Sequence, residues 1–142
     1  MRAEHLYRLR FSYPEAWAVG AGGSMQTTFG IAEGRCEGRI SGRFRGANHA
    51  RIRPDGTYLP DFQGYIATDD GAEILLDLRG RGHVRGDDFR ATGTVTHVSG
   101  DERYSFLNDV VCAIEEEVRA RSDGSGADLV IDVYELVEEF QP

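Results

Sequence analysis

The sequence contains no lysine, and all sixteen of its basic residues are arginines. A chain without lysine cannot form a Schiff base with a carbonyl substrate or with pyridoxal phosphate, and it lacks the lysine of a Walker-type phosphate loop. Gly20, Gly22 and Gly23 form a glycine-rich stretch, but their spacing is not that of a dinucleotide-binding loop and no helical pattern follows them. We therefore expect a flexible loop here, and no cofactor.

Cysteine and histidine are sparse as well. The two cysteines, Cys36 and Cys112, have no CxxC spacing, and the four histidines show neither an HxH nor an HxxxH pattern. No metal site is therefore predicted. Two free thiols in a reducing cytosol are the expected state of the cysteines, and a disulfide between them stays open as the alternative.

Long hydrophobic runs and excess positive charge are also missing. No segment approaches the ~20 apolar residues that span a membrane, and the N-terminal residues 1–11 lack the apolar core of a signal peptide. The formal net charge is −8 and the pI is about 4.9, which argues against nucleic acids and anionic membranes as partners. We expect a cytoplasmic protein of one domain, residues 1–142.

Short stretches of alternating apolar and polar residues dominate the rest of the sequence. The alternation is strict between Cys36 and Arg45, which is the period of a β-strand, and eighteen glycines fit tight turns. The predicted strands are 5–13, 27–34, 36–52, 57–68, 72–82, 88–98, 110–118 and 127–137, with a short helical turn at 101–108. Short, evenly spaced strands predict an all-β fold, a single closed antiparallel β-barrel of about eight strands.

Two Asp-Gly turns allow the strand register to be predicted. In "TDDGA" a three-residue loop at 69–71 places Asp61 opposite Arg79 on the next strand. The same kind of loop at 54–56, in "RPDGT", places His49 opposite Asp61. One face of these strands then becomes wholly apolar and the other largely polar, which favours three-residue loops over two-residue loops.

This register aligns His49, Asp61 and Arg79 in one row across three strands, with neighbouring side chains roughly 4.5–5.5 Å apart. Further polar side chains on the same face are Arg45, Gln63, Tyr65 and Asp77. The face is either the polar lining of a ligand cavity or a solvated outer surface with weak ion pairs. In the second case, the interior is filled by the apolar side chains Phe62, Ile66, Ile74, Leu76 and Leu78.

An ordered set of short motifs adds a family resemblance. "RPDG", Asp61, "TDDGAEI", "RG", "RYSFLN" and "DVYE" follow one another along nearly the whole chain. Together they resemble the bacterial family called domain of unknown function 3237. The resemblance implies a lipocalin-like or calycin-like eight-stranded barrel that binds a small molecule, and it favours an inward orientation of the polar row. It implies no particular activity.

The sequence also departs from the pattern of that family. An Asp-Trp pair often precedes the "RPDG" turn, where this chain has Asn48 and His49, and an Arg-Tyr pair often follows the strand aspartate, where it has Gln63 and Gly64. Two large aromatic side chains are thereby lost, which would widen a cavity. The ligand is therefore expected to differ from that of typical relatives.

The predicted row has the groups needed for acid–base chemistry. His49 beside Asp61 could act as a general base, because a carboxylate fixes the imidazole tautomer. Arg79 could bind a carboxylate or stabilise an enolate or phenolate, with Tyr65 and Gln63 contacting a carbonyl oxygen. This set suits isomerisation, cyclisation or retro-aldol cleavage of a small aromatic or carbonyl compound.

Other polar residues carry weaker hypotheses. Asn108 in "RYSFLN" could point into the cavity with Arg45 and Asp77, or it could hold a turn at the barrel end. The charge run at 115–118 is interpreted as a solvated strand end. Tyr13 and Trp17 could cap a barrel mouth or plug it.

Two functions therefore stay open from the sequence. The first is a small-molecule-binding barrel, with or without catalysis by His49, Asp61 and Arg79. The second is a non-catalytic oligomeric accessory or scaffold protein with a packed interior. A homo-oligomer is compatible with either.

Overall fold

The computed structural model describes residues 1–20, 25–86 and 88–142. Gly22 and Gly23 of the glycine-rich stretch lie outside the described residues. The elements are β1 (Arg2–Gly20), β2 (Gln26–Gly38), β3 (Gly42–Asn48), β4 (Arg51–Ile52), β5 (Thr57–Leu59), β6 (Asp61–Thr68), β7 (Glu73–Arg85), β8 (Asp88–Val98), the 3₁₀-helix η1 (Glu102–Asp109), β9 (Cys112–Ala120) and β10 (Ala127–Val137). The one described helix is neither long nor apolar enough to cross a membrane.

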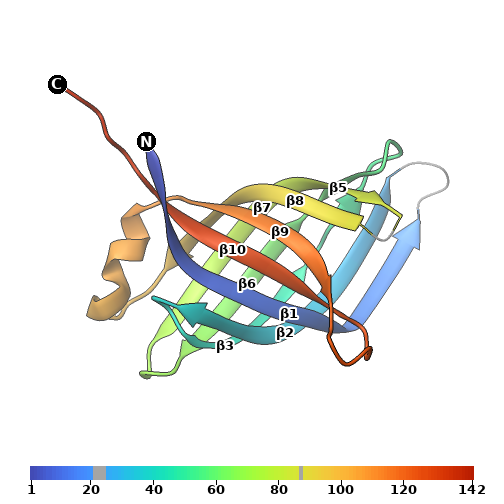
Figure 1. Cartoon of the computed structure of the whole chain (residues 1–142), viewed down its shortest axis with the longest axis horizontal. Helices are drawn as coiled ribbons and strands as arrows, with labels where there is room; N and C mark the ends of the chain where they lie inside the picture. Colours follow the sequence, from blue (N-terminus) through green and yellow to red (C-terminus); the bar gives the residue numbers. More distant parts are fainter. Residues whose placement is uncertain (21–24, 87) are drawn as a thin grey trace.

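Eight of the strands form a closed antiparallel ring. The order around it is β1, β2, β3, β6, β7, β8, β9 and β10, and β10 pairs again with β1. The remaining strands, β4 and β5, form a small hairpin that joins β2 to β7 at one end of this ring (Figure 1). The predicted all-β architecture with eight ring strands is confirmed.

The strand boundaries follow local backbone chemistry. β8 and β10 have the predicted limits, but the stretch predicted as one strand at 36–52 is divided among β2, β3 and β4, with a turn after Gly38, whose φ is +143°. The stretch 57–68 is split at Pro60, because proline has no N–H to donate to a strand ladder. These differences shorten single strands and leave the ring intact.

The predicted register is also confirmed. Asp61 pairs with Arg79 on β7, and the backbone N–H of His49 donates to the carbonyl oxygen of Asp61 at 2.9 Å. Gly71 and Gly56 have φ values of +90° and +86°, the left-handed conformation that each three-residue loop requires at its glycine. Local turn chemistry therefore determined which residues face each other across three strands.

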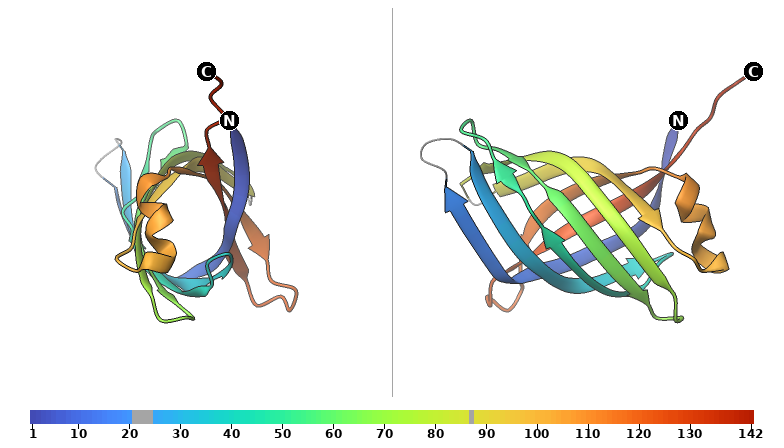
Figure 2. Two further views of the ribbon diagram at one scale, coloured as in Figure 1. Left: turned by 90° about the vertical axis from the view of Figure 1, so that its left-hand side faces the viewer. Right: turned by 180° about the vertical axis from the view of Figure 1, so that it is seen from behind.

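The interior of the ring is apolar over most of its length. η1 lies at one end of the ring (Figure 2), where Tyr104 and Leu107 are buried against the interior. We call this the η1 end. The opposite end, with the β4–β5 hairpin, is the open end, because the inward-facing Val84 and Val118 are 54% and 38% exposed there.

Candidate binding site at the open end of the ring

The predicted polar row lies on the outer surface of the ring. Arg79 is 62% exposed and contacts the Asp61 carboxylate at 3.1 Å and that of Asp77 at 3.3 Å. The His49 side chain is exposed and packs edge-on against Phe29, with ring centroids 6.4 Å apart. The expected inward orientation of the row is therefore wrong, although the row itself exists.

The physical reason is the apolar face of the same strands. Burying Phe62, Ile66 and Leu78 removes far more apolar surface from water than burying the charged face would, and an ion pair recovers little of the desolvation cost. The other residues of the polar face point outward too, where Arg45 pairs with Glu33 at 2.9 Å. These outward-facing residues are Arg45, Gln63, Tyr65 and Asp77.

Asn108 has a structural role at the η1 end. Its Oδ1 accepts from the backbone N–H of Ser99 at 2.8 Å, and its Nδ2 donates to the carbonyl oxygen of Ser99 at 2.9 Å. Both polar groups of the amide are therefore used in holding the chain where β8 leads into η1. The prediction that Asn108 binds a ligand is not supported by this geometry, and the alternative of a turn-holding residue fits it.

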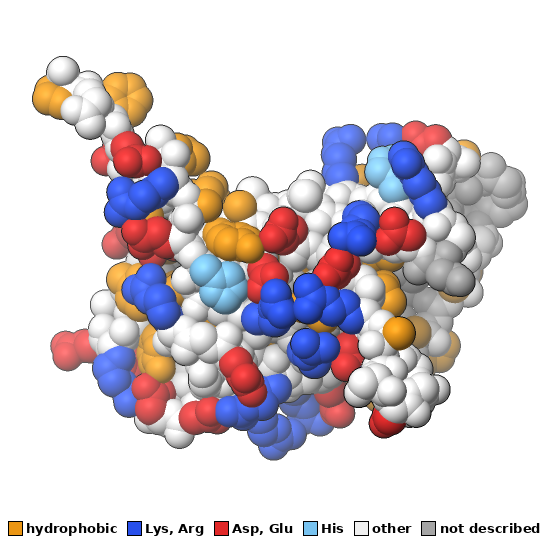
Figure 3. All heavy atoms as spheres, viewed as in Figure 1, with side chains coloured by type: hydrophobic (Ala, Val, Ile, Leu, Met, Phe, Trp, Pro, Cys, Tyr) orange, Lys and Arg blue, Asp and Glu red, His pale blue; other side chains and the backbone are white. Residues whose placement is uncertain are grey.

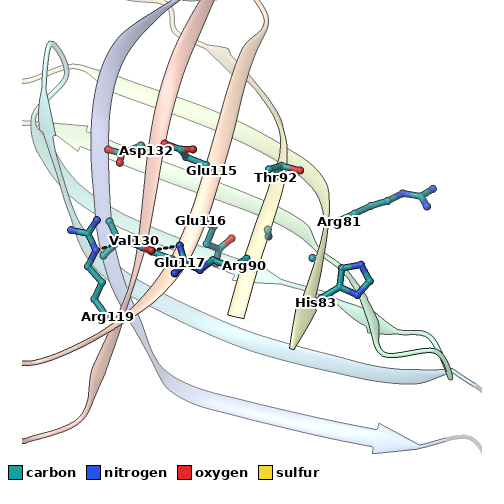
Figure 4. A pocket seen from close by; sticks show the side chains of 12 residues that line it. Arg81, His83, Arg90, Thr92, Glu115, Glu116, Glu117, Arg119, Val130 and Asp132 are labelled. Atoms are coloured by element: carbon teal, nitrogen blue, oxygen red, sulfur yellow. Dashed lines mark hydrogen bonds and ion pairs between the residues drawn. The ribbon is translucent and has the colours of Figure 1, made fainter. Parts of the chain in front are cut away.

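The outer surface carries two grooves, one of about 680 Å³ across β1, β2 and β10, and one of about 380 Å³ across β7, β8, β9 and β10, whose lining includes Glu116. Arg90 and Arg119 converge on the carboxylate of Glu117, at 2.6 and 2.5 Å (Figure 4). Charged side chains of both signs also intermingle over the face of the molecule seen in Figure 3. The Glu117 carboxylate in this second groove is thus already paired with two arginines.

A different polar cluster lies inside the ring, near the open end. Glu116 occupies an inward position of β9 between Ile114 and Val118 and is only 9% exposed. Burial alone raises the pKa of its carboxyl group from 4.5 to about 7. A carboxyl group that titrates near neutral pH can both accept and donate a proton under physiological conditions.

Asn48 organises two tyrosines at the same end. Its Nδ2 donates to the phenol oxygens of Tyr13 at 3.0 Å and Tyr58 at 2.6 Å. Its Oδ1 accepts from the backbone N–H of Asp61 at 3.1 Å, which fixes the orientation of the amide. Three side chains from β1, β3 and β5 are thereby held together inside the ring.

Burial and, to a smaller extent, the charge of Glu116 contribute to the raised pKa values of both tyrosines. Burial, followed by the charge of Glu116, raises the pKa of Tyr58 to about 12. Burial, followed by Tyr58, raises the pKa of Tyr13 still further. Both phenols therefore keep their protons at neutral pH and act as hydrogen-bond donors.

Two small residues separate Tyr58 from Glu116 along one inward row. The inward row runs from Tyr58 on β5 through Gly82 on β7 and Ala91 on β8 to Glu116 on β9. A Cβ atom at Gly82 would lie 2.8 Å from the Cβ of Ala91, so this part of the row is filled by backbone and one methyl group. A cavity of about 70 Å³ borders the three organised side chains Tyr13, Asn48 and Tyr58, and its other lining residues come from β1 and β2 and do not include Glu116.

Aromatic rings form the walls around the cluster. Phe89 packs edge-on against Tyr58 with centroids 5.2 Å apart, and Phe11 packs against Tyr13 at 5.5 Å. Such walls favour a flat, apolar ligand body. We call Tyr13, Asn48, Tyr58 and Glu116 the open-end cluster.

A second buried polar pair lies toward the η1 end. The Tyr7 hydroxyl and the His97 Nε2 are 2.8 Å apart, and both residues are almost fully buried. Burial lowers the pKa of His97 from 6.5 to about 4. Its Nδ1 is buried without a hydrogen-bond partner among the described residues.

The sequence contained a signal for Glu116 that went unused. Cys112, Ile114, Glu116 and Val118 share one phase of the strand alternation, and the other members of that phase are apolar. A lone carboxylate in an apolar phase points into a core, whereas the run at 115–118 was interpreted as a solvated end. Tyr58 had no comparable signal, because its position depends on how the β4–β5 hairpin folds against β7.

Comparison with solved structures supports the architecture. A β-barrel-like protein from Acinetobacter baumannii AYE is 20% identical, with a TM-score of 0.79 over 94% of both chains. A protein of unknown function from Clostridium acetobutylicum ATCC 824 is 14% identical, with a TM-score of 0.80 over 96% of this chain and 100% of that one. An enzyme from Penicillium herquei is 18% identical, with a TM-score of 0.69 over 93% of both chains. Likeness at such identities shows the shared fold.

Comparison by sequence gives the family. No curated protein matches the chain. The model of a family described as a protein of unknown function (DUF3237) matches residues 1–136. The motifs "RPDG", "TDDGAEI" and "RYSFLN" therefore resemble those of the right family, and this chain is a member of DUF3237.

Proposed function

We propose that this protein is a lipocalin-like, cytoplasmic small-molecule-binding barrel whose site is the open end of the ring. The observation that carries the proposal is the buried carboxyl group of Glu116, which faces the same solvent-accessible end as the Tyr13–Asn48–Tyr58 group. An ionisable group that burial destabilises is costly in a purely structural core. Aromatic walls and a few convergent polar groups are the usual composition of a ligand site.

The chemistry of this end suits a cofactor-independent acid–base reaction. Glu116 can take a proton from a bound compound and return it, since its pKa of about 7 lies near the working pH. The expected ligand is a small aromatic or carbonyl compound, and isomerisation, cyclisation and lyase reactions all need such a proton transfer. That one solved structure of the same fold is an enzyme from Penicillium herquei is compatible with this proposal.

The outer row of His49, Asp61 and Arg79 stays a hypothesis for catalysis. One set of variants distinguishes this outer row from the open-end cluster. We would record NMR spectra of the isotopically labelled protein while adding small cyclic ketones, aryl ketones and phenols at millimolar concentration. We expect amide shifts around Tyr13, Tyr58 and Glu116, and we expect Glu116→Gln to remove the pH dependence of binding. Asp61→Asn serves as the matched control on the outer face.

Two results would count against the open-end site. One is a set of shifts confined to the outer row, or to the outward-facing groove residues Arg90, Glu117 and Arg119. The other is a pH dependence of binding that Asp61→Asn abolishes and Glu116→Gln leaves intact, which would restore the outer row as the site.

A second candidate function is an oligomeric accessory protein. The observation that favours it is a pair of exposed aromatic rings on the outer face, Trp17 and Phe29, stacked with centroids 6.0 Å apart. If this function is the right one, native mass spectrometry will show an oligomer that Trp17→Ala dissociates, and none of the compounds above will shift the open-end resonances.

A further inference from the structure

We propose that Tyr13 and Tyr58 donate two hydrogen bonds to a single oxygen atom of the ligand, and that the site is therefore built for an enolisable ketone. This inference rests on the proposed function and adds the class of substrate and the roles of the two phenols. It follows from counting donors and acceptors at Asn48.

The orientation of the Asn48 amide is determined by its neighbours. Its Oδ1 accepts from the backbone N–H of Asp61, so its Nδ2 must face the two phenol oxygens. An amide nitrogen has two hydrogens, and the two tyrosines use both. Asn48 is 4% exposed, so this arrangement is held by the packing around it as well as by its hydrogen bonds.

The consequence concerns the protons of the tyrosines. Each phenol oxygen accepts from Asn48, and each phenol retains one O–H. Without a ligand, the Tyr13 hydroxyl is directed toward the Tyr58 oxygen, and a ligand oxygen placed between the two phenols would accept this hydrogen instead. Accepting a hydrogen bond makes a hydroxyl a stronger donor, because hydrogen bonds in a chain polarise one another. The two phenol oxygens flank one nitrogen at 3.0 and 2.6 Å and border the same cavity of about 70 Å³.

Two neutral donors around one small cavity match an oxygen that gains negative charge. Preorganised donors of this kind stabilise an oxyanion in a site from which water is largely excluded. The raised pKa values of both tyrosines mean that they stay protonated while doing so. A ligand carboxylate fits less well as a substrate, because its permanent charge would keep Glu116 protonated, and a protonated carboxyl group cannot act as a base.

The proton transfer balances with the groups present. The Glu116 carboxylate takes a proton from the carbon next to the ketone, and the electron pair of that C–H bond forms a C=C bond. The carbonyl π pair moves onto the oxygen, which becomes an enolate oxygen bound by Tyr13 and Tyr58. Glu116 then returns its proton to the same or to a conjugated carbon, and the carbonyl re-forms.

The probe for the two donors is a nitrophenol, a stable mimic of an enolate, measured below its own pKa. We expect the bound nitrophenol to be ionised, as seen in its visible absorbance, with its proton on Glu116. Tyr13→Phe and Tyr58→Phe should each weaken binding about 10- to 100-fold, the usual effect of losing one hydrogen bond to a charged group. Tyr65→Phe, an outward-facing tyrosine on β6, is the matched control and should leave the affinity unchanged.

Asn48→Asp is a sharper test, because it preserves shape and reverses donor and acceptor. An aspartate would accept both phenol protons, so binding of the nitrophenolate should be lost although both tyrosines are present.

Exchange of the α-hydrogens of a cyclic ketone in heavy water, followed by NMR, tests the reaction. The exchange rate with the wild-type protein should exceed the rate in buffer alone. The rate with Glu116→Gln should equal the rate in buffer, and the rate with Glu115→Gln should equal that of wild type.

The outcomes separate this inference from the proposed function. A nitrophenol that shifts the open-end resonances but binds un-ionised, or equally well to Tyr13→Phe and Tyr58→Phe, overturns the two-donor inference and leaves small-molecule binding in place. Exchange by wild type no faster than buffer overturns the enolisation step. If nothing binds at the open end, the proposed function fails, and this inference fails with it.

Discussion

The two ends of the ring both bury ionisable groups, but in different surroundings. Toward the η1 end, Tyr7 and His97 contact each other at 2.8 Å inside a core of apolar side chains. At the open end, Glu116 shares the interior with two tyrosines that an asparagine holds in place, and the inward-facing Val84 and Val118 are exposed. Apolar side chains surround the pair at the η1 end, whereas a cavity of about 70 Å³ borders the tyrosines at the open end.

The difference comes from what covers each end. At the η1 end the Tyr104 hydroxyl donates to the Asp70 carboxylate at 2.6 Å and Arg103 donates to the Asp70 carbonyl at 2.9 Å, so the helix is fastened to the β6–β7 turn. The open end is bordered instead by the β4–β5 hairpin, where β4 pairs with β2 through only Gln26 and Thr27. Stability therefore concentrates at the η1 end, and adaptable structure concentrates at the other.

The largest expected contrast is in core truncation. Ile74→Ala, at a fully buried site near the η1 end, should lower the free energy of unfolding by about 2–5 kcal/mol, because it leaves a cavity. Val84→Ala, at an inward but exposed site of the open end, should cost less than about 0.5 kcal/mol. Urea denaturation measures both, and equal losses would mean that the open end is packed as tightly as the rest.

The pH dependence of stability should reveal opposite slopes from the two ends. The pKa of Glu116 rises from 4.5 to about 7 on folding, so the folded protein keeps a proton that the unfolded chain releases, and stability falls as pH rises through this window. The pKa of His97 drops from 6.5 to about 4 on folding, so its contribution is lost as pH falls through that window. Each shift corresponds to about 3 kcal/mol, and the two largely cancel between pH 4.5 and 6.5.

Substitution of Glu116 or His97 should therefore reveal the pH dependence of stability that the other residue contributes. Glu116→Gln should give a protein whose free energy of unfolding decreases on acidification, and His97→Gln should give one whose free energy of unfolding decreases on alkalinisation. Denaturation curves at a series of pH values supply the slopes, and Glu115→Gln, on the outer face, is the control. Slopes identical to wild type in both variants would contradict the buried titrations.

Substitution of two turn glycines should lower stability by an intermediate amount, and the two variants should differ in how much of the structure is loosened. Gly71 at the η1 end and Gly56 at the open end have φ values of +90° and +86°. Alanine at either position should cost about 1–2 kcal/mol of local strain. Hydrogen exchange should show that Gly71→Ala loosens the ring, whereas Gly56→Ala opens only the β4–β5 hairpin, moves Tyr58 and weakens ligand binding. Uniform loosening in both variants would remove the distinction between the ends.

The smallest effect is expected on the outer face. Arg79→Ala removes contacts to Asp61 and Asp77 that are exposed to solvent. Such ion pairs contribute little, so the free energy of unfolding should change by less than about 1 kcal/mol and ligand binding should not change. Loss of binding by this variant would return the outer row to consideration as the site.

Local chemistry explains which features could be predicted. The Asp-Gly turns at 54–56 and 69–71 determine the pairing of His49, Asp61 and Arg79, because the loop type sets the register of a hairpin. Glu116 could have been found by its phase within β9. The cavity face could not be chosen from either hairpin alone, since alternation divides side chains into two faces without saying which becomes the interior.

The sequence by itself determined the strands, the turns, the antiparallel register and the family. Only the tertiary structure decided which face points inward and brought Tyr13, Asn48, Tyr58 and Glu116 from four separate strands to one end of the ring. The reason is that strand pattern and turn type are local properties of the chain. Burial follows from closure of the whole ring, which places the apolar face inside and leaves a few polar groups near its open end.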